Sequence, residues 1–120
     1  MVEYPHLLLE NLSTGYAEPR GRRTVSSELN LGIASGEVVM LMGPNGSGKS
    51  TLMHTIAGLL PPLSGQVKIL GRSLARLGRR DVARALSLVL TERVDGGNMT
   101  VWDVVALGRF PYTNFFGKLQ

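Results

Sequence analysis

The amino-acid sequence predicts an α/β fold built around a strand, a glycine-rich loop and a helix that follow one another directly. The run Glu37–Met42 is apolar after its first residue, which is typical of a strand covered on both faces, as in a parallel sheet flanked by helices. The run ends at Gly43, and from Lys49 onward apolar residues recur at helical spacing until Pro61. This succession is the centre of the predicted fold.

Two strands are expected before this centre. Residues 6–12 form a short apolar segment, and residues 29–33 alternate in polarity, as a strand with one buried face does. Residues 14–23 are polar and contain Gly and Pro, which predicts a loop with Tyr16 as its single aromatic residue. We therefore expect an antiparallel β portion at the N-terminus.

Short elements are expected after the central helix. The pattern predicts strands at 66–70 and 87–90 and a helix over the arginine-rich stretch 72–84. Thr100 and Asp103 have the spacing of a capping box, with the Thr100 hydroxyl at the N-cap. The helix that they open carries on one face Val101, Val104, Val105 and Gly108, and Pro111 closes it.

Composition excludes several classes of protein. The chain has 120 residues and no Cys, which excludes a disulfide scaffold, a thiolate metal site and a cysteine nucleophile. Its longest uninterrupted apolar run has five residues, from Val38 to Met42, far below the roughly 20 that span a bilayer. The N-terminus has no basic region or cleavage site typical of a secretory signal.

The positive charge is concentrated in one stretch. Residues 72–84 hold five Arg and one Asp, which accounts for the whole net charge of +4. On a helix these arginines share one broad face, which predicts a solvated surface. No aromatic residues alternate with them, so a stacking platform for single strands is not indicated and no nucleic-acid partner is expected.

Residues 43–50 match the pattern G-x-x-x-x-G-K-[ST] at every fixed position. Glycines allow positive φ values, so that successive amides form a nest for phosphate at a helix N-terminus. Lys49 reaches the β- and γ-phosphates, and the Ser50 hydroxyl can ligate Mg²⁺. The predicted nucleotide-binding residues are Gly43, Pro44, Asn45, Gly46, Ser47, Gly48, Lys49, Ser50 and Thr51. The motif indicates a P-loop nucleoside triphosphate site, and a glycine-rich turn without a ligand is the alternative.

Four stretches carry a family resemblance. Tyr16 and residues 29–37, 43–52 and 58–65 are similar to the N-terminal half of an ATP-binding-cassette (ABC) transporter ATPase. Residues 98–112 resemble the subgroup that imports iron-siderophore, haem and cobalamin complexes. The resemblance implies ATP and Mg²⁺ as cofactors, with Tyr16 stacked on the adenine ring. A tyrosine packed on its own loop is the alternative.

The same resemblance implies a peripheral protein at the cytoplasmic face of the cell membrane, with a permease and a second ATPase subunit as partners. Hydrolysis in this family needs an apolar strand that ends in Asp-Glu, a Leu-Ser-Gly-Gly-Gln-type loop and a later His, and the 120 residues contain none of these. We therefore expect a fragment that is inactive alone, with a nucleotide-binding core over 1–97 and the start of a helical subdomain over 98–120.

The sequence departs from the family after the predicted strand 87–90. A glutamine is expected there, and Thr91 and Glu92 stand in its place. A carboxylate only accepts hydrogen bonds, whereas glutamine also donates. We predict that Glu92 approaches Mg²⁺ or its waters, and that Lys49 and Glu92 are the catalytic residues. An ion pair between Glu92 and Arg93 or Arg84 is the alternative.

Two other functions stay open. A small self-contained P-loop kinase would use Glu92 beside the metal and the 72–84 helix to hold an anionic acceptor. A nonenzymatic adaptor would dock its aromatic C-terminal segment on a partner. The aromatic residues there are Trp102, Phe110, Tyr112, Phe115 and Phe116. We interpret them as core side chains of a missing half, with contact to a permease as the alternative.

Overall fold

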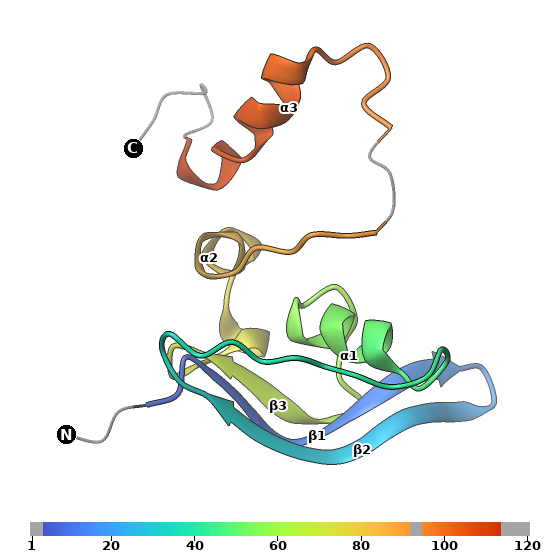
Figure 1. The fold of residues 1–120 in the computed structure, drawn as a ribbon. Helices are drawn as coiled ribbons and strands as arrows, with labels where there is room; N and C mark the ends of the chain where they lie inside the picture. Colours follow the sequence, from blue (N-terminus) through green and yellow to red (C-terminus); the bar gives the residue numbers. More distant parts are fainter. Residues whose placement is uncertain (1–3, 92–94, 114–120) are drawn as a thin grey trace. The chain divides into compact units, whose positions relative to one another are not determined.

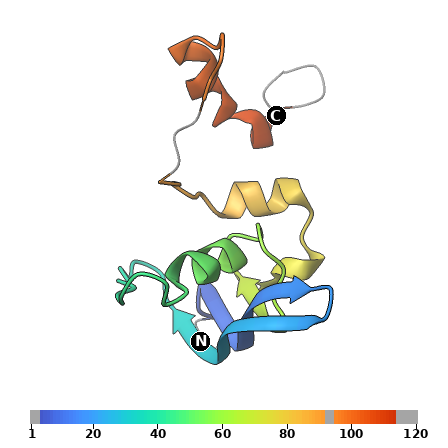
Figure 2. The same cartoon turned by 90° about the vertical axis from the view of Figure 1, so that its right-hand side faces the viewer.

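The structure of the chain is a computed structural model that describes residues 4–91 and 95–113. It divides into two compact units, Met1–Leu77 and Gly78–Gln120. In the first unit, helix α1 (Lys49–Ile56) covers one face of a sheet (Figure 1, Figure 2). The units divide at Leu77, and the subdomain boundary predicted at residue 97 stays a prediction.

The sheet of the first unit has four strands in the order β2-β1-β3-β4, and every neighbouring pair is antiparallel. The strands are β1 (Leu7–Glu18), β2 (Gly21–Ile33), β3 (Ser64–Ile69) and β4 (Arg72–Ser73). The predicted strands at 6–12, 29–33 and 66–70 fall on β1, β2 and β3. The antiparallel β portion expected at the N-terminus is therefore confirmed.

The loop expected at 14–23 is wrong, because these residues form the facing ends of β1 and β2 and the turn between them. Tyr16 therefore lies on a strand, directly opposite Arg23. A two-stranded ribbon with exposed side chains carries little hydropathy signal, so its polar sequence suggested a loop. Gly15 permits a local irregularity, since its φ is 155° and a Cβ there would collide with the Arg23 carbonyl oxygen.

The core of the first unit is small and combines apolar with hydroxyl-bearing side chains. Its buried side chains belong to Leu9, Leu12, Val67, Ile69, Ser13, Thr14, Thr51 and Thr55, and Gly15 is buried beside them. Thr55 Oγ1 donates to the Thr51 carbonyl oxygen at 2.8 Å, which satisfies this hydroxyl inside α1. The helix ends at Ile56, before the expected Pro61, and Gly58 follows with a positive φ of 75°.

Two apolar runs predicted as strands, 37–42 and 87–90, form no strand. Val38 is 97% exposed and Val89 is 95% exposed. A strand needs a neighbour whose backbone pairs with its own. Within residues 4–91 and 95–113, the sheet consists of β1 to β4 only, so neither run has a paired neighbour. The hydropathy of these two runs is typical of buried segments, but no strand or helix among the described residues buries them.

The second unit contains the short helices α2 (Arg79–Ala85) and α3 (Val101–Leu107) and the 3-10 turn η2 (Phe110–Tyr112). The single helix expected over 72–84 is wrong. This stretch begins as β4, which pairs with β3, and continues as the 3-10 turn η1 (Leu74–Arg76) before α2. None of the helices in the described part of the chain has the length and apolar character needed to cross a membrane.

The capping box predicted at the start of α3 is confirmed. Asp103 N donates to Thr100 Oγ1 at 3.2 Å, and Thr100 N donates to Asp103 Oδ2 at 2.8 Å. The Thr100 hydroxyl and the Thr100 backbone N–H both donate to Asp103 Oδ2, and these two hydrogen bonds lower the pKa of the Asp103 carboxyl group. The cap therefore works best with an ionised carboxylate.

Arginines of α2 contact η2, so the solvated arginine surface expected from the sequence is only part of their role. Arg84 Nε donates to the Pro111 carbonyl oxygen at 2.9 Å. The guanidinium groups of Arg84 and Arg109 lie 5.5 Å and 5.2 Å from the centroid of the Tyr112 ring. The hydrogen bond and the cation–π contact of Arg84 hold η2 against α2, whereas the Arg109 contact lies within the η2 segment itself.

Candidate nucleotide-binding site

The loop before α1 folds tightly through its glycines. Gly46 and Gly48 have φ values of 80° and 97°, a region that residues with a Cβ rarely adopt. Gly48 is also the N-cap of α1, where a Cβ would collide with Val25 Cγ1. Ser47 N donates to the Pro44 carbonyl oxygen at 3.2 Å, which closes the turn between the glycines. The positive φ angle therefore favours glycine at both positions, and the contact with Val25 of β2 also requires it at Gly48.

The Lys49 ammonium group is held by the loop that precedes it. Its Nζ donates to the carbonyl oxygens of Gly43 and Pro44, both at 2.7 Å, and to Ser47 Oγ at 3.5 Å. An ammonium group has only donors, so these contacts fix a positive charge at the loop. A phosphate oxygen could replace a carbonyl here with a charge-assisted hydrogen bond.

The start of α1 suits an anion. Leu52 N donates to the Gly48 carbonyl oxygen at 2.9 Å, so the amides of Lys49, Ser50 and Thr51 precede this helical hydrogen bond. The first turn contains no acidic residue. A helix end of this kind carries partial positive charge and amides that face outward.

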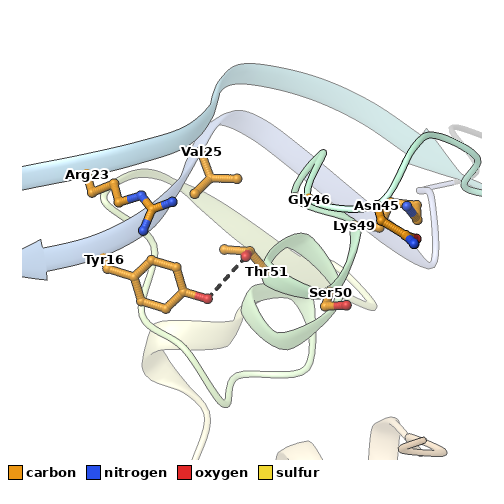
Figure 3. A pocket seen from close by; sticks show the side chains of 9 residues that line it. Tyr16, Arg23, Val25, Asn45, Gly46, Lys49, Ser50 and Thr51 are labelled. Carbon is orange, nitrogen blue, oxygen red and sulfur yellow. Dashed lines mark hydrogen bonds between the residues drawn. The ribbon is translucent and has the colours of Figure 1, made fainter.

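The structure brings Tyr16 to the start of α1, 35 residues further along the chain. Its hydroxyl lies 3.2 Å from Thr51 Oγ1, and either oxygen can donate in this hydrogen bond (Figure 3). The Thr51 side chain is buried, whereas the Tyr16 side chain is 43% exposed. The hydroxyl end of the tyrosine is thus tied to the helix, and much of its surface stays accessible.

These elements surround one cavity of about 480 Å³ (Figure 3). Its lining residues are Tyr16, Arg23, Val25, Asn45, Gly46, Gly48, Lys49, Ser50 and Thr51. Arg23 and Val25 on β2 are the two that the sequence did not predict. Arg23 pairs with Tyr16 across the two strands, so a predicted hairpin would have placed Arg23 beside Tyr16. A loop is expected at 14–23 instead, and a loop predicts no such pairing. The predicted residues Gly43, Pro44 and Ser47 are not in the lining and instead contact Lys49.

The donor set for a metal ion is sparse in the described chain. Ser50 places its hydroxyl-bearing side chain in the cavity beside Lys49. Within residues 4–91 and 95–113, no three His, Asp or Glu side chains gather as a metal-binding group. The Ser50 hydroxyl is an oxygen ligand of the kind that Mg²⁺ takes together with waters and substrate phosphates. Glu92, Phe115 and Phe116 lie outside the described residues.

Comparisons with known proteins agree on one family. A family model described as ABC transporter matches residues 26–115. The chain is 50% identical over 113 residues to an uncharacterized ABC transporter ATP-binding protein of Methanocaldococcus jannaschii, which covers 94% of this chain and 38% of that protein. It is 39% identical over 106 residues to a probable siderophore transport system ATP-binding protein of Bacillus subtilis, with 88% and 37% covered.

A solved structure supports the same conclusion. The dimeric structure of a bacterial ABC transporter cassette matches with a TM-score of 0.76 and 27% identity, over 90% of this chain and 49% of that one. The chain spans less than two fifths of the length of these two relatives and about half of the solved cassette. The resemblance and the α/β fold class predicted from the sequence are both confirmed. The chain belongs to the ABC transporter family of ATP-binding proteins.

Proposed function

We propose that this chain carries the ATP site of an ABC importer subunit, which couples ATP hydrolysis to uptake of an iron-siderophore or a related metal chelate. The observation that carries the proposal is a cavity that Tyr16, the phosphate loop and the start of α1 line together. Outward-facing amides and the Lys49 ammonium group suit phosphates, and the flat face of Tyr16 suits a base. One ligand that offers both groups is a nucleoside triphosphate.

Each residue has a defined role in this proposal. Lys49 exchanges the carbonyl oxygens of Gly43 and Pro44 for the β- and γ-phosphates. The Ser50 hydroxyl would hold Mg²⁺, which supplies positive charge between these phosphates when bound. Tyr16 stacks on adenine while its hydroxyl contacts Thr51, so the spacing between the base and phosphate ends is fixed.

We assign hydrolysis to the complete subunit and its partner rather than to the described residues. The acidic strand end, the signature loop and the later His that the family uses are missing from the 120 residues. The similar solved cassette is dimeric, which supports a second ATPase subunit as partner. Glu92 is proposed as a residue near the metal, and a permease is proposed to hold the subunit at the cytoplasmic face of the membrane.

The importer class rests on two observations that are independent of the cavity. Residues 98–112 resemble the iron-siderophore, haem and cobalamin subgroup. The Bacillus subtilis relative is described as part of a siderophore transport system. Both favour a metal chelate as the transported substrate.

The Lys49→Ala variant of the complete gene product tests the ATP site. Loss of one charge-assisted contact to phosphate weakens ATP binding about tenfold to a hundredfold. Titration calorimetry with ATP and Mg²⁺ measures the change. Arg20→Ala is the control, because Arg20 lies at the β1–β2 turn and is not among the cavity-lining residues. Equal ATP affinity in Lys49→Ala and the wild type would contradict the proposal.

A further inference from the structure

Arg23 and Tyr16 form one wall of the cavity. They are direct cross-strand partners in the antiparallel pair β1–β2, so their side chains stand on the same face of the ribbon. Both line the cavity, and Figure 3 shows the guanidinium group of Arg23 beside the Tyr16 ring. The hairpin therefore presents an aromatic ring and a cation together.

The guanidinium group of Arg23 has no hydrogen bond or ion pair with any residue in 4–91 or 95–113. The neighbouring Arg22 differs, because its Nη1 donates to the Leu63 carbonyl oxygen at 3.3 Å. Arg23 is also exposed, so protein contacts do not hold its side chain. Five N–H donors of a permanently charged group thus remain available to a ligand in the cavity.

Arg23 lies at the end of the cavity away from the phosphate loop. In Figure 3, Arg23 and Tyr16 are at one side of the view, and Asn45 and Lys49 are at the other. Lys49 already supplies positive charge at the loop, where its ammonium group donates hydrogen bonds to the carbonyl oxygens of Gly43 and Pro44. A second cation at the opposite end is suited to a different part of the ligand.

We propose that Arg23 is a nucleotide-binding residue that contacts the base and ribose half of the ligand. Its guanidinium group donates to acceptor atoms of the purine ring or of the ribose hydroxyls, beside the base that stacks on Tyr16. Guanidinium has no acceptor, so it recognises acceptor atoms only. This inference rests on the proposed ATP site and adds an anchor outside the phosphate loop.

The test compares two probes, ATP and inorganic tripolyphosphate, each titrated with Mg²⁺ into the complete gene product. Arg23→Gln removes the charge and most of the donors, and weakens ATP binding about tenfold. Tripolyphosphate has no base or ribose, so its affinity stays within about twofold. Arg23→Lys restores part of the ATP affinity, because the charge returns without the planar donor group. Arg20→Gln, a matched change in the same hairpin, alters neither affinity.

Different results separate this inference from the proposed function. If Arg23→Gln binds ATP as tightly as the wild type, or weakens both probes equally, Arg23 is not a contact of the base and ribose half. Lys49→Ala weakens both probes, because it acts at the phosphates. If the wild type binds neither probe, the proposed ATP site itself is wrong.

Discussion

The two compact units of this chain are stabilised by different interactions. In Met1–Leu77, four apolar and four hydroxyl-bearing residues are buried between the sheet and α1 or within them. In the described part of Gly78–Gln120 no residue is buried. Val101 and Trp102, for example, are 82% and 81% exposed. That unit is held by a helix cap, hydrogen bonds and cation–π contacts.

The comparison shows that apolar content alone does not make a core. Both units contain exposed apolar runs, at 37–42 in the first and 87–90 in the second, but only the first unit also brings a sheet face and a helix together around buried side chains. The candidate site belongs to that unit, and the buried Thr51 is both a core residue and the hydrogen-bond partner of Tyr16. We therefore expect changes in the first unit to affect stability most.

The largest effect is expected for Leu12→Ala. Leu12 is fully buried in β1, and removal of such a side chain costs about 2–5 kcal/mol of unfolding free energy. Urea unfolding of the 120-residue chain, followed by circular dichroism, measures the loss. Leu107→Ala is the matched control in α3, because Leu107 is 49% exposed. A similar loss in both variants would remove the difference between the two units.

The sequence predicted the parts of the site that depend on local residue types. The phosphate loop follows from its glycines, Lys49 and Ser50, and the capping box follows from the spacing of Thr100 and Asp103. Tyr16 came from family resemblance, because nothing in its local sequence connects it with a loop 30 residues away. These features depend on the types of residue at given positions and on the order of motifs along the chain, and both can be read from the sequence.

The remaining features depend on pairing between distant residues. Arg23 and Val25 reach the cavity only because β2 pairs with β1, and polar residues on an exposed ribbon do not display this pairing. The runs 37–42 and 87–90 have strand-like hydropathy but lack paired neighbours among the described residues. Hydropathy reports suitability for burial, and the presence of a partner decides whether burial occurs.

A smaller effect is expected for Thr100→Ala in the second unit. This change removes the N-cap hydrogen bond to Asp103 N, and such losses cost about 1 kcal/mol of helix stability. Hydrogen exchange of the α3 amides measures the change. Protection in the variant equal to that in the wild type would show that the cap does not stabilise this helix.

The same cap gives a pH dependence with a defined sign. Hydrogen bonds from Thr100 lower the pKa of the Asp103 carboxyl group in the folded chain. Its contribution to α3 is therefore present above the ordinary Asp pKa and is lost as pH falls through the lowered value. NMR titration of the Asp103 carboxyl carbon measures this pKa, and Thr100→Ala raises it toward the ordinary value. An unchanged pKa in Thr100→Ala would contradict this cause.

The smallest effect is expected for Val89→Ser. Val89 is 95% exposed, and substitutions at such positions change the unfolding free energy by less than about 0.5 kcal/mol. Val67→Ser is the matched change in the first unit, where the side chain is buried in β3; it costs about 2–3 kcal/mol, because it removes apolar contacts and buries a hydroxyl. Urea unfolding of both variants of the 120-residue chain gives the two values.

A cost above about 1 kcal/mol for Val89→Ser would place Val89 in a covered environment. The 87–90 run would then be a buried segment of the second unit, and the contrast between the two units would disappear.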